Sequence, residues 1–227
     1  MKTFKILLIG ALVSLVLAGS ADANLIVSSD FSGTTLAATN LDPASSGSLG
    51  KWLGVGSAPD SGWSVAFDGA NYFARQWGGG DYVLMQGIAG PFAAGQQFSF
   101  NMDYAYTAGF QTSAIGVVTI LGGNSGDTPI GVYAGGSANW SFATWDVLFS
   151  DQLDYTADWS ISSGTFGIGS SYDVIAIVVR AGIYPGTAGL RAVDDVVIER
   201  VPEPSTLLLL GSGLLGLVGY GRRRFKK

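Results

Sequence analysis

The stretch Gln97–Thr107, QFSFNMDYAYT, decides the fold class, because large side chains alternate with small or polar ones along it. The large side chains stand at every second position: Phe98, Phe100, Met102, Tyr104 and Tyr106. Successive side chains of a β-strand point to opposite faces, so all five fall on one face. The stretch therefore predicts a strand with one face toward a hydrophobic core.

Nine other segments predict strands, and clusters of glycine, serine and asparagine separate them. They are Leu25–Phe31, Trp63–Phe67, Tyr72–Trp77, Tyr82–Ile88, Ala114–Leu121, Ile130–Ala134, Trp140–Phe149, Val174–Arg180 and Leu190–Arg200. Ala37–Gly50 is small and polar, and it predicts a long loop. About ten short strands at this spacing predict an all-β protein, an antiparallel β-sandwich.

The first 23 residues have the layout of a secretory signal peptide. Two lysines precede the apolar run Ile6–Ala18, and Ala21 and Ala23 supply the small side chains that signal peptidase needs. We expect the mature chain to begin at Asn24. The alternative is an uncleaved anchor, although the run is shorter than the ~20 residues of a spanning helix.

The C-terminal 27 residues combine three parts in a fixed order. A proline-containing segment precedes a short apolar, glycine-rich stretch, which predicts a hydrophobic helix, and a basic end. The parts are Val201-Pro202-Glu203-Pro204-Ser205, Leu207–Tyr220 and Arg222-Arg223-Arg224-Phe225-Lys226-Lys227. The apolar stretch would span roughly 21 Å as a helix, less than a hydrocarbon core of about 30 Å. The basic end should stay cytoplasmic, so the segment predicts transient inner-membrane insertion.

This tail resembles the PEP-CTERM sorting signal of proteins that an exosortase processes. The resemblance implies recognition in the inner membrane and cleavage near Pro202–Ser205. It further implies delivery to the cell surface or to exopolysaccharide, often in biofilm- or floc-forming bacteria. The alternative is a permanent C-terminal anchor. The chain then divides into a signal peptide (1–23), a folded domain (24–200) and a sorting signal (201–227).

The folded domain is acidic and lacks the residues of several common catalytic sites. It holds 15 of the 17 acidic residues but five of the 12 basic ones, a net charge of about −10. Such a surface repels nucleic-acid phosphates, so nucleic-acid binding is not expected. The chain has no histidine and no cysteine, which excludes Ser-His-Asp triads, Cys-His pairs and the usual zinc sites. A two-carboxylate hydrolase stays open, although Glu199 is the only glutamate of the domain.

Short landmarks spread over the domain resemble galactose-binding-like jelly rolls, a group that includes many carbohydrate-binding modules. They are Asn24-Leu25-Ile26-Val27 with Asp30-Phe31, Gly62-Trp63, Tyr82–Gln86 and Val193–Ile198. The resemblance implies a jelly-roll fold. One departure is Ser32, where such modules often carry a glutamate.

Asp194 is a candidate metal ligand. In the last predicted strand it shares a face with Ala192, Val196 and Ile198, and a carboxylate on an apolar face needs a cation or several donors. Related jelly rolls often hold a structural calcium where the first and last strands meet, which suits oxygen ligands. We therefore expect a calcium site formed by Asp194 and Asp30. The alternative is a pairing of Asp194 with one of two arginines, Arg180 or Arg191.

Two tryptophans beside basic residues are candidates for sugar binding. Trp77 lies next to three glycines and near Arg75, and Trp52 follows Lys51 in a glycine-rich region. An exposed tryptophan beside a charged hydrogen-bonding group offers a flat face to a sugar ring. The other interpretation is that these side chains fill the open end of a sandwich. We expect Trp63, Trp140 and Trp145 to lie in the core.

Together these features predict a non-enzymatic surface or matrix protein that engages exopolysaccharide. The alternatives are a purely structural matrix component that assembles through sheet edges poor in lysine, and an extracellular hydrolase.

Overall fold

The structure, a computed structural model, describes the chain in segments. They are residues 24–26, 29–32, 36, 40–41, 50–54, 62–77, 83–106, 116–127, 131–134, 137–140, 143–154, 156, 158–180, 190–202 and 212–213. Contacts divide the chain into two units, one of Asn24–Glu199 and one of Met1–Ala23 with Arg200–Lys227.

The two targeting segments lie almost wholly outside the described residues. This holds for the expected signal peptide, with Ala21 and Ala23, and for Glu203, Pro204, Ser205 and the arginine cluster. Ser212 and Gly213 are helical and exposed. Among the described residues, no helix has the length and apolar character that a membrane crossing requires.

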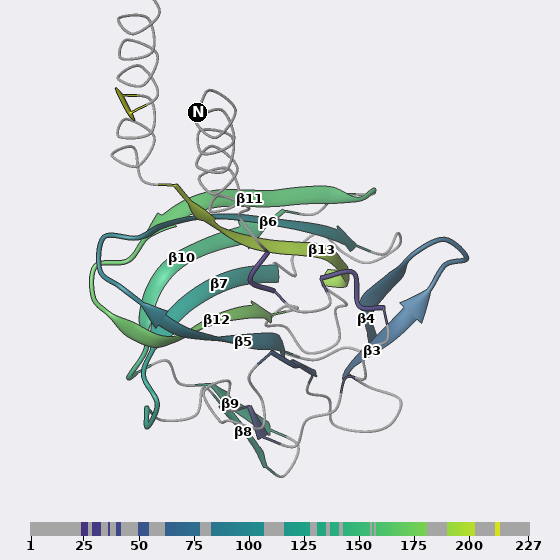
Figure 1. Cartoon of the computed structure of the whole chain (residues 1–227). Helices are drawn as coiled ribbons and strands as arrows, with labels where there is room; N and C mark the ends of the chain where they lie inside the picture. The colour runs from purple at the N-terminus through teal and green to yellow at the C-terminus, as the bar shows by residue number, and fades with distance from the viewer. Residues whose placement is uncertain are drawn as a thin grey trace, which may run out of the picture. The chain divides into compact units, whose positions relative to one another are not determined.

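Ten strands form two five-stranded antiparallel sheets (Figure 1). The first sheet has the order β10-β7-β12-β5-β2, and the second has the order β11-β6-β13-β4-β3. The strands of the first are β10 (Asp146–Leu153), β7 (Gly116–Gly123), β12 (Tyr172–Arg180), β5 (Val83–Phe92) and β2 (Trp52–Gly54). Those of the second are β11 (Ser160–Gly167), β6 (Gln97–Tyr106), β13 (Leu190–Val201), β4 (Tyr72–Trp77) and β3 (Gly62–Phe67). A small third sheet contains β1 (Asn40–Leu41), β8 (Gly131–Ala134) and β9 (Ser137–Trp140).

The connectivity of the longer strands is that of a jelly roll. In chain order, β4, β6, β11 and β13 contribute to the second sheet, while β5, β7, β10 and β12 contribute to the first. The chain therefore crosses between the sheets at almost every step, and β13 returns to lie beside β4. This interleaving of two four-stranded sets is the double Greek key of the jelly roll. The predicted fold class is confirmed.

The core lies between the two sheets, and β6 faces it as its alternation predicts. All five large side chains of the strand are at most 6% exposed, and those between them are half-buried on the outer face. The Tyr106 hydroxyl donates to the Leu153 carbonyl (2.6 Å) and accepts from the Gly116 N–H (2.9 Å). This phenol, although buried, thus joins the ends of β6, β10 and β7 without leaving a polar group unsatisfied.

The first sheet is buried on both faces over much of its width, and two glycines allow large rings to lie against it. A Cβ on Gly122 would stand 2.7 Å from the Tyr172 ring, and one on Gly123 would stand 2.4 Å from the Trp145 ring. Both distances are too short for a real side chain. Trp145 is buried, as predicted.

Three sequence predictions of secondary structure are wrong. The described part of Leu25–Phe31 forms bends and turns, although it follows β13 through Leu25 N–H to Ile198 O (2.8 Å) and Val196 N–H to Ser29 O (3.3 Å). Trp140–Phe149 is two strands, because β9 ends at Trp140 and β10 begins at Asp146. The loop prediction for Ala37–Gly50 missed the short β1.

Candidate functional site

A pocket of about 170 Å³ opens on the outer face of the second sheet. Its lining comes from three strands, one turn and the residue that precedes β11: Asp68, Asn71, Phe73, Asp103, Trp159, Asp194 and Asp195. Asp103 lies between the core-facing Met102 and Tyr104 on β6, which places its carboxylate on the side away from the core.

Trp159 forms the exposed aromatic wall of this pocket. Its side chain is 46% exposed, and its ring meets the Phe73 ring edge-on, with centroids 5.9 Å apart and planes at 85°. Trp159 directly precedes β11, whereas Phe73 belongs to β4, and β6 and β13 lie between these strands. Three strand spacings amount to about 14 Å, so the two rings reach toward each other across the sheet. The outer face is therefore hollowed under them.

The turn between β3 and β4 supplies the polar rim. The Asp68 carboxylate accepts hydrogen bonds from the N–H groups of Ala70 and Asn71, both at 2.9 Å, and Gly69 takes a φ of +103° that favours glycine. These backbone bonds lower the pKa of the Asp68 carboxyl, because they favour its charged form. Asp68 is thus a fixed anion at the pocket mouth.

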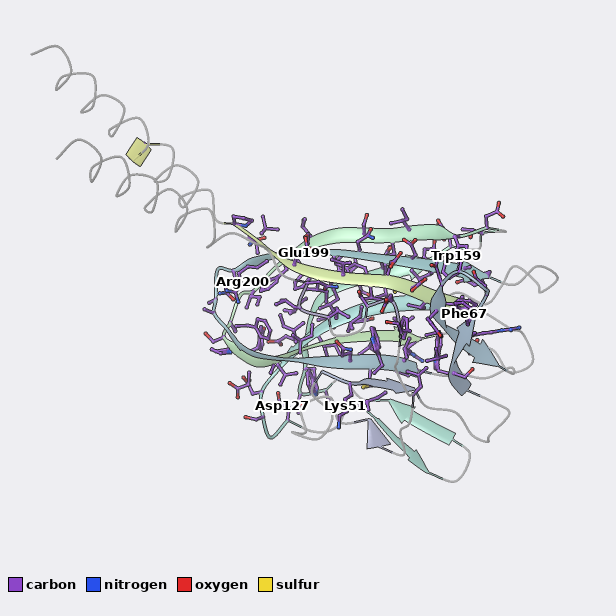
Figure 2. All side chains as sticks on the ribbon, turned by 45° about the vertical axis from the view of Figure 1, so that its right-hand side comes forward. Lys51, Phe67, Asp127, Trp159, Glu199 and Arg200 are labelled. Atoms are coloured by element: carbon purple, nitrogen blue, oxygen red, sulfur yellow. The ribbon has the colours of Figure 1, made fainter. Side chains whose placement is uncertain are left out.

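Two exposed rings lie at the same hairpin. Phe67 and Tyr72 are 54% and 43% exposed, and their centroids are 4.7 Å apart. Figure 2 shows the labelled Phe67 and Trp159 toward the same end of the sandwich. This end therefore combines exposed aromatic rings with carboxylates.

A β-bulge in β13 turns Asp194 toward the pocket. Val193, Val196 and Ile198 belong to the core. Val193 and Val196 are three residues apart, whereas core-facing residues of a regular strand are two apart. Asp195, between them, has a φ of +45°, unusual for a residue other than glycine. One extra residue in a strand shifts its alternation by one position. The prediction that Asp194 shares the face of Val196 and Ile198 is therefore wrong.

Two carboxyl groups at the floor of the pocket, those of Asp194 and Asp103, have raised pKa values. Burial is the main cause that raises the pKa of Asp194 to about 6, and the negative charges of Asp195, Asp103 and Asp30 add to it, while the hydrogen bond from Asp195 N–H (2.9 Å) opposes it. Burial and Asp195 also raise the pKa of Asp103. Among the described residues of the lining, every ionisable side chain is acidic.

Of the three residues predicted to bind sugar, the structure describes the side chains of Trp52 and Arg75. Trp52 is 2% exposed and packs on Phe31 with ring centroids 4.9 Å apart, so the prediction that it is an exposed platform is wrong. Trp77 ends β4, but its side chain lies outside the described part. Arg75 is half-buried in β4, opposite Ala192, and stands two residues from Phe73 on the same face.

The two expected calcium ligands, Asp30 and Asp194, interact electrostatically, but among the described residues they do not belong to a group of three or more metal ligands. The Asp30 carboxylate accepts hydrogen bonds from the N–H (3.2 Å) and hydroxyl (2.9 Å) of Ser32. Within the described ranges, no three acidic side chains group as ligands of one ion. Calcium at Asp30 and Asp194 stays a prediction.

Sequence reasoning missed Trp159, the exposed aromatic residue of the pocket lining. It stands beside Asp158 in a loop before β11, a strand of small and polar residues that no periodicity indicated. The sequence gives a weak signal that Trp159 is exposed. The residues that follow it, Ser160–Gly164, are mostly small and polar, and an isolated large ring in such a segment has little reason to be buried.

Comparisons with known proteins agree with the two resemblances seen in the sequence. A profile described as the PEP-CTERM protein-sorting motif matches residues 200–224. The chain therefore carries a PEP-CTERM sorting motif, which indicates an exported protein processed at the membrane. Comparison with curated proteins finds no match.

Solved structures similar to this chain include carbohydrate-binding modules. A structure described as CBM4 is 18% identical, with a TM-score of 0.49, covering 78% of this chain and 99% of that chain. A CBM61 module in complex with β-1,4-galactotriose is 15% identical, with a TM-score of 0.44 and coverages of 79% and 99%. The CBM22-1 xylan-binding domain from Paenibacillus barcinonensis is 12% identical, with a TM-score of 0.42 and coverages of 74% and 99%. At these values the similarity concerns the fold, and a ligand must be argued from this chain's own residues.

Proposed function

We propose that the protein is an exported, exosortase-processed surface or matrix protein that binds a glycan in the pocket beside Trp159. The observation that carries the proposal is an exposed tryptophan held at the wall of a pocket whose rim presents fixed oxygen acceptors. Exopolysaccharide of the producing cell's matrix is the expected partner. In this role the protein is not an enzyme.

The pocket offers the two kinds of contact that sugar rings use. The apolar face of a pyranose ring stacks on a flat aromatic ring, and its hydroxyl groups donate to fixed acceptors. Trp159 supplies the ring, and Phe73 holds it edge-on. Asp68 supplies a carboxylate oriented by two backbone N–H groups. Preorganised groups of this kind lose little conformational entropy on binding.

One observation favours the alternative of a hydrolase. The pKa of Asp194, raised to about 6, lies where a carboxyl group serves as a general acid near neutral pH. Glycosidases place their two carboxyl groups on either side of the bond that they cleave, whereas Asp194 and its neighbours are close enough to repel one another. Release of reducing sugar from a bound glycan would establish the hydrolase.

Removing the Trp159 ring should weaken glycan binding by about 5- to 150-fold, if a sugar ring stacked on it gains what a stacked base gains, on the order of 1–3 kcal/mol. Affinity electrophoresis in gels cast with the producer's polysaccharide or with neutral glycans measures this as lost retardation of Trp159→Ala. Val147→Ala is the matched control, since Val147 is exposed on β10 of the other sheet. Equal retardation of wild type and Trp159→Ala would remove the pocket from glycan binding.

The sorting tail makes a separate prediction about the mature protein. Signal peptidase should remove the N-terminal end, and an exosortase-type enzyme should remove the C-terminal end. The intact mass of the exported protein should therefore correspond to a chain that begins at Asn24 and lacks Arg222–Lys227. The apolar stretch before this basic end is too short for a stable anchor. A surface-displayed protein that keeps its basic end would instead indicate a permanent anchor.

A further inference from the structure

We propose that the pocket selects a glycan with free amino groups, such as a polymer containing de-N-acetylated hexosamine, over uncharged or uronic-acid glycans. This inference rests on the proposed glycan binding and specifies the ligand of the same pocket. Its basis is the coincidence of an exposed tryptophan face with a floor and rim of aspartates.

The charge of the pocket excludes one class of matrix polymer. Asp68, Asp103 and Asp195 line it together with Asp194, and no basic side chain lines it among the residues that the structure describes. A uronic-acid chain would bring its own carboxylates against these groups, at a cost that grows as water is excluded. A protonated amine reverses the sign of this interaction and forms charge-assisted hydrogen bonds.

The surroundings of Asp194 and Asp103 disfavour the charged forms of these two carboxyl groups in the free protein. Asp194 is 7% exposed, and Asp195, Asp103 and Asp30 all act on it with like charge. Asp103 lies on β6 and Asp195 on β13, so two neighbouring strands direct carboxylates to one place. A cation bound among them would stabilise every charged form at once.

Trp159 connects the amine with the sugar ring. An ammonium group within about 6 Å of an indole centroid gains cation–π attraction beyond simple stacking. Ile161, which is 63% exposed and lies opposite Asp103 across the β11–β6 ladder, extends the apolar surface beside the carboxylates. An amino sugar presents an apolar ring face and an adjacent cation, which matches this pairing.

Arg75 is the basic residue placed nearest to the pocket by the strand register. It stands two residues from Phe73 along β4, opposite Ala192, and it is outside the lining. Arg75 therefore stands beside the residues described for the pocket lining.

The experiment compares three oligosaccharide probes of equal length by calorimetry with the exported protein at pH 6: glucosamine, N-acetylglucosamine and galacturonic acid oligomers. We expect the glucosamine oligomer to bind at least about tenfold more tightly than the acetylated one. Attraction between an ammonium group and a carboxylate a few ångströms apart is large enough for this difference at a partly exposed site. The galacturonic acid oligomer should not bind.

Asp103→Asn tests the origin of this preference. The substitution keeps the side-chain shape and removes the negative charge, so it should reduce the preference for the amine to less than about threefold. Asp154→Asn is the control, because Asp154 is an exposed residue after β10 whose loss changes the net charge equally.

The outcomes separate the two proposals. Equal binding of the glucosamine and acetylated oligomers, with both lost in Trp159→Ala, would overturn the amine preference and leave glycan binding intact. A preference that Asp154→Asn reduces as much as Asp103→Asn would assign it to net charge and also overturn the inference. Binding of no probe, together with unchanged gel mobility in every polysaccharide, would overturn both proposals.

Discussion

Replacing Trp52 with alanine is expected to lower the free energy of unfolding by about 3–5 kcal/mol. Trp52 is 2% exposed on the short strand β2, and its ring packs on Phe31, which is fully buried. Truncation would leave a large cavity where the N-terminal segment meets the first sheet. Urea unfolding of the exported protein, followed by the fluorescence of the remaining tryptophans, measures the loss.

Trp52→Phe is the control for this prediction. It keeps an aromatic ring against Phe31, so it should lose less stability than alanine, and its retardation in polysaccharide gels should equal that of the wild type. A Trp52→Ala protein as stable as the wild type, or a Trp52→Phe protein that fails to bind glycan, would return Trp52 to the surface role that its neighbours in the sequence indicate.

Asp194→Asn is expected to raise the free energy of unfolding at pH 8 by on the order of 2 kcal/mol. The folded protein raises the pKa of this carboxyl from 3.8 to about 6. The protonated form therefore contributes stability that is fully present below the unfolded value of 3.8 and is lost as the pH rises through about 6. Asparagine is neutral at all pH values, and its amide oxygen can still accept the Asp195 N–H. The melting temperatures of the two proteins should be equal below pH 4 and should differ increasingly between pH 4 and pH 7.

Calcium would produce the opposite result for the same variant. If Asp194 and Asp30 held an ion, a chelator would lower the melting temperature of the wild type, and Asp194→Asn would be the less stable protein at pH 8. Stabilisation by Asp194→Asn that is independent of chelator would remove Asp194 from the metal role. Asp154→Asn, with its exposed carboxylate, should change the melting temperature little at any pH.

The strands that could be predicted from the sequence are those with large apolar side chains on one face and small or polar ones on the other. The alternation of β6 depends on one core and one solvent-facing side, and each large side chain is where the period of two predicts it. In β11 this signal is absent. Of its eight residues, Ser162 and Phe166 are buried and Ile161 is exposed, so a hydrophobic pattern does not describe it. The strand forms because its backbone pairs with β6 over its full length.

The orientation of Asp194 could not be predicted because it depends on a bulge. A period of two carried from Ala192 to Ile198 assigns Asp194 to the core face, and the positive φ of Asp195 breaks that period. Aspartate tolerates this conformation better than most residues, but its sequence neighbours do not reveal it. The sequence singles out Asp194 as a metal ligand, which stays a prediction, whereas its surroundings required the fold.

The pocket itself brings together residues that are far apart in the sequence. Asp68, Asp103, Trp159 and Asp194 meet because the jelly-roll order places β4, β13, β6 and β11 side by side. Local reasoning favoured tryptophans beside basic residues, and it placed Trp52 on the surface. Tertiary packing decided otherwise, since Phe31 and the first sheet cover the Trp52 ring.

The most direct test of the account is a map of glycan-induced NMR shifts on the exported protein, with the indole N–H signals assigned by substitution. With a glucosamine oligomer as the probe, the account predicts that the largest changes occur at the Trp159 indole and at the backbone of Asp103, Asp195 and Asn71. Trp52 and the strands β5 and β12 should be unaffected. Shifts confined to the first sheet, with an unmoved Trp159 signal, would contradict it.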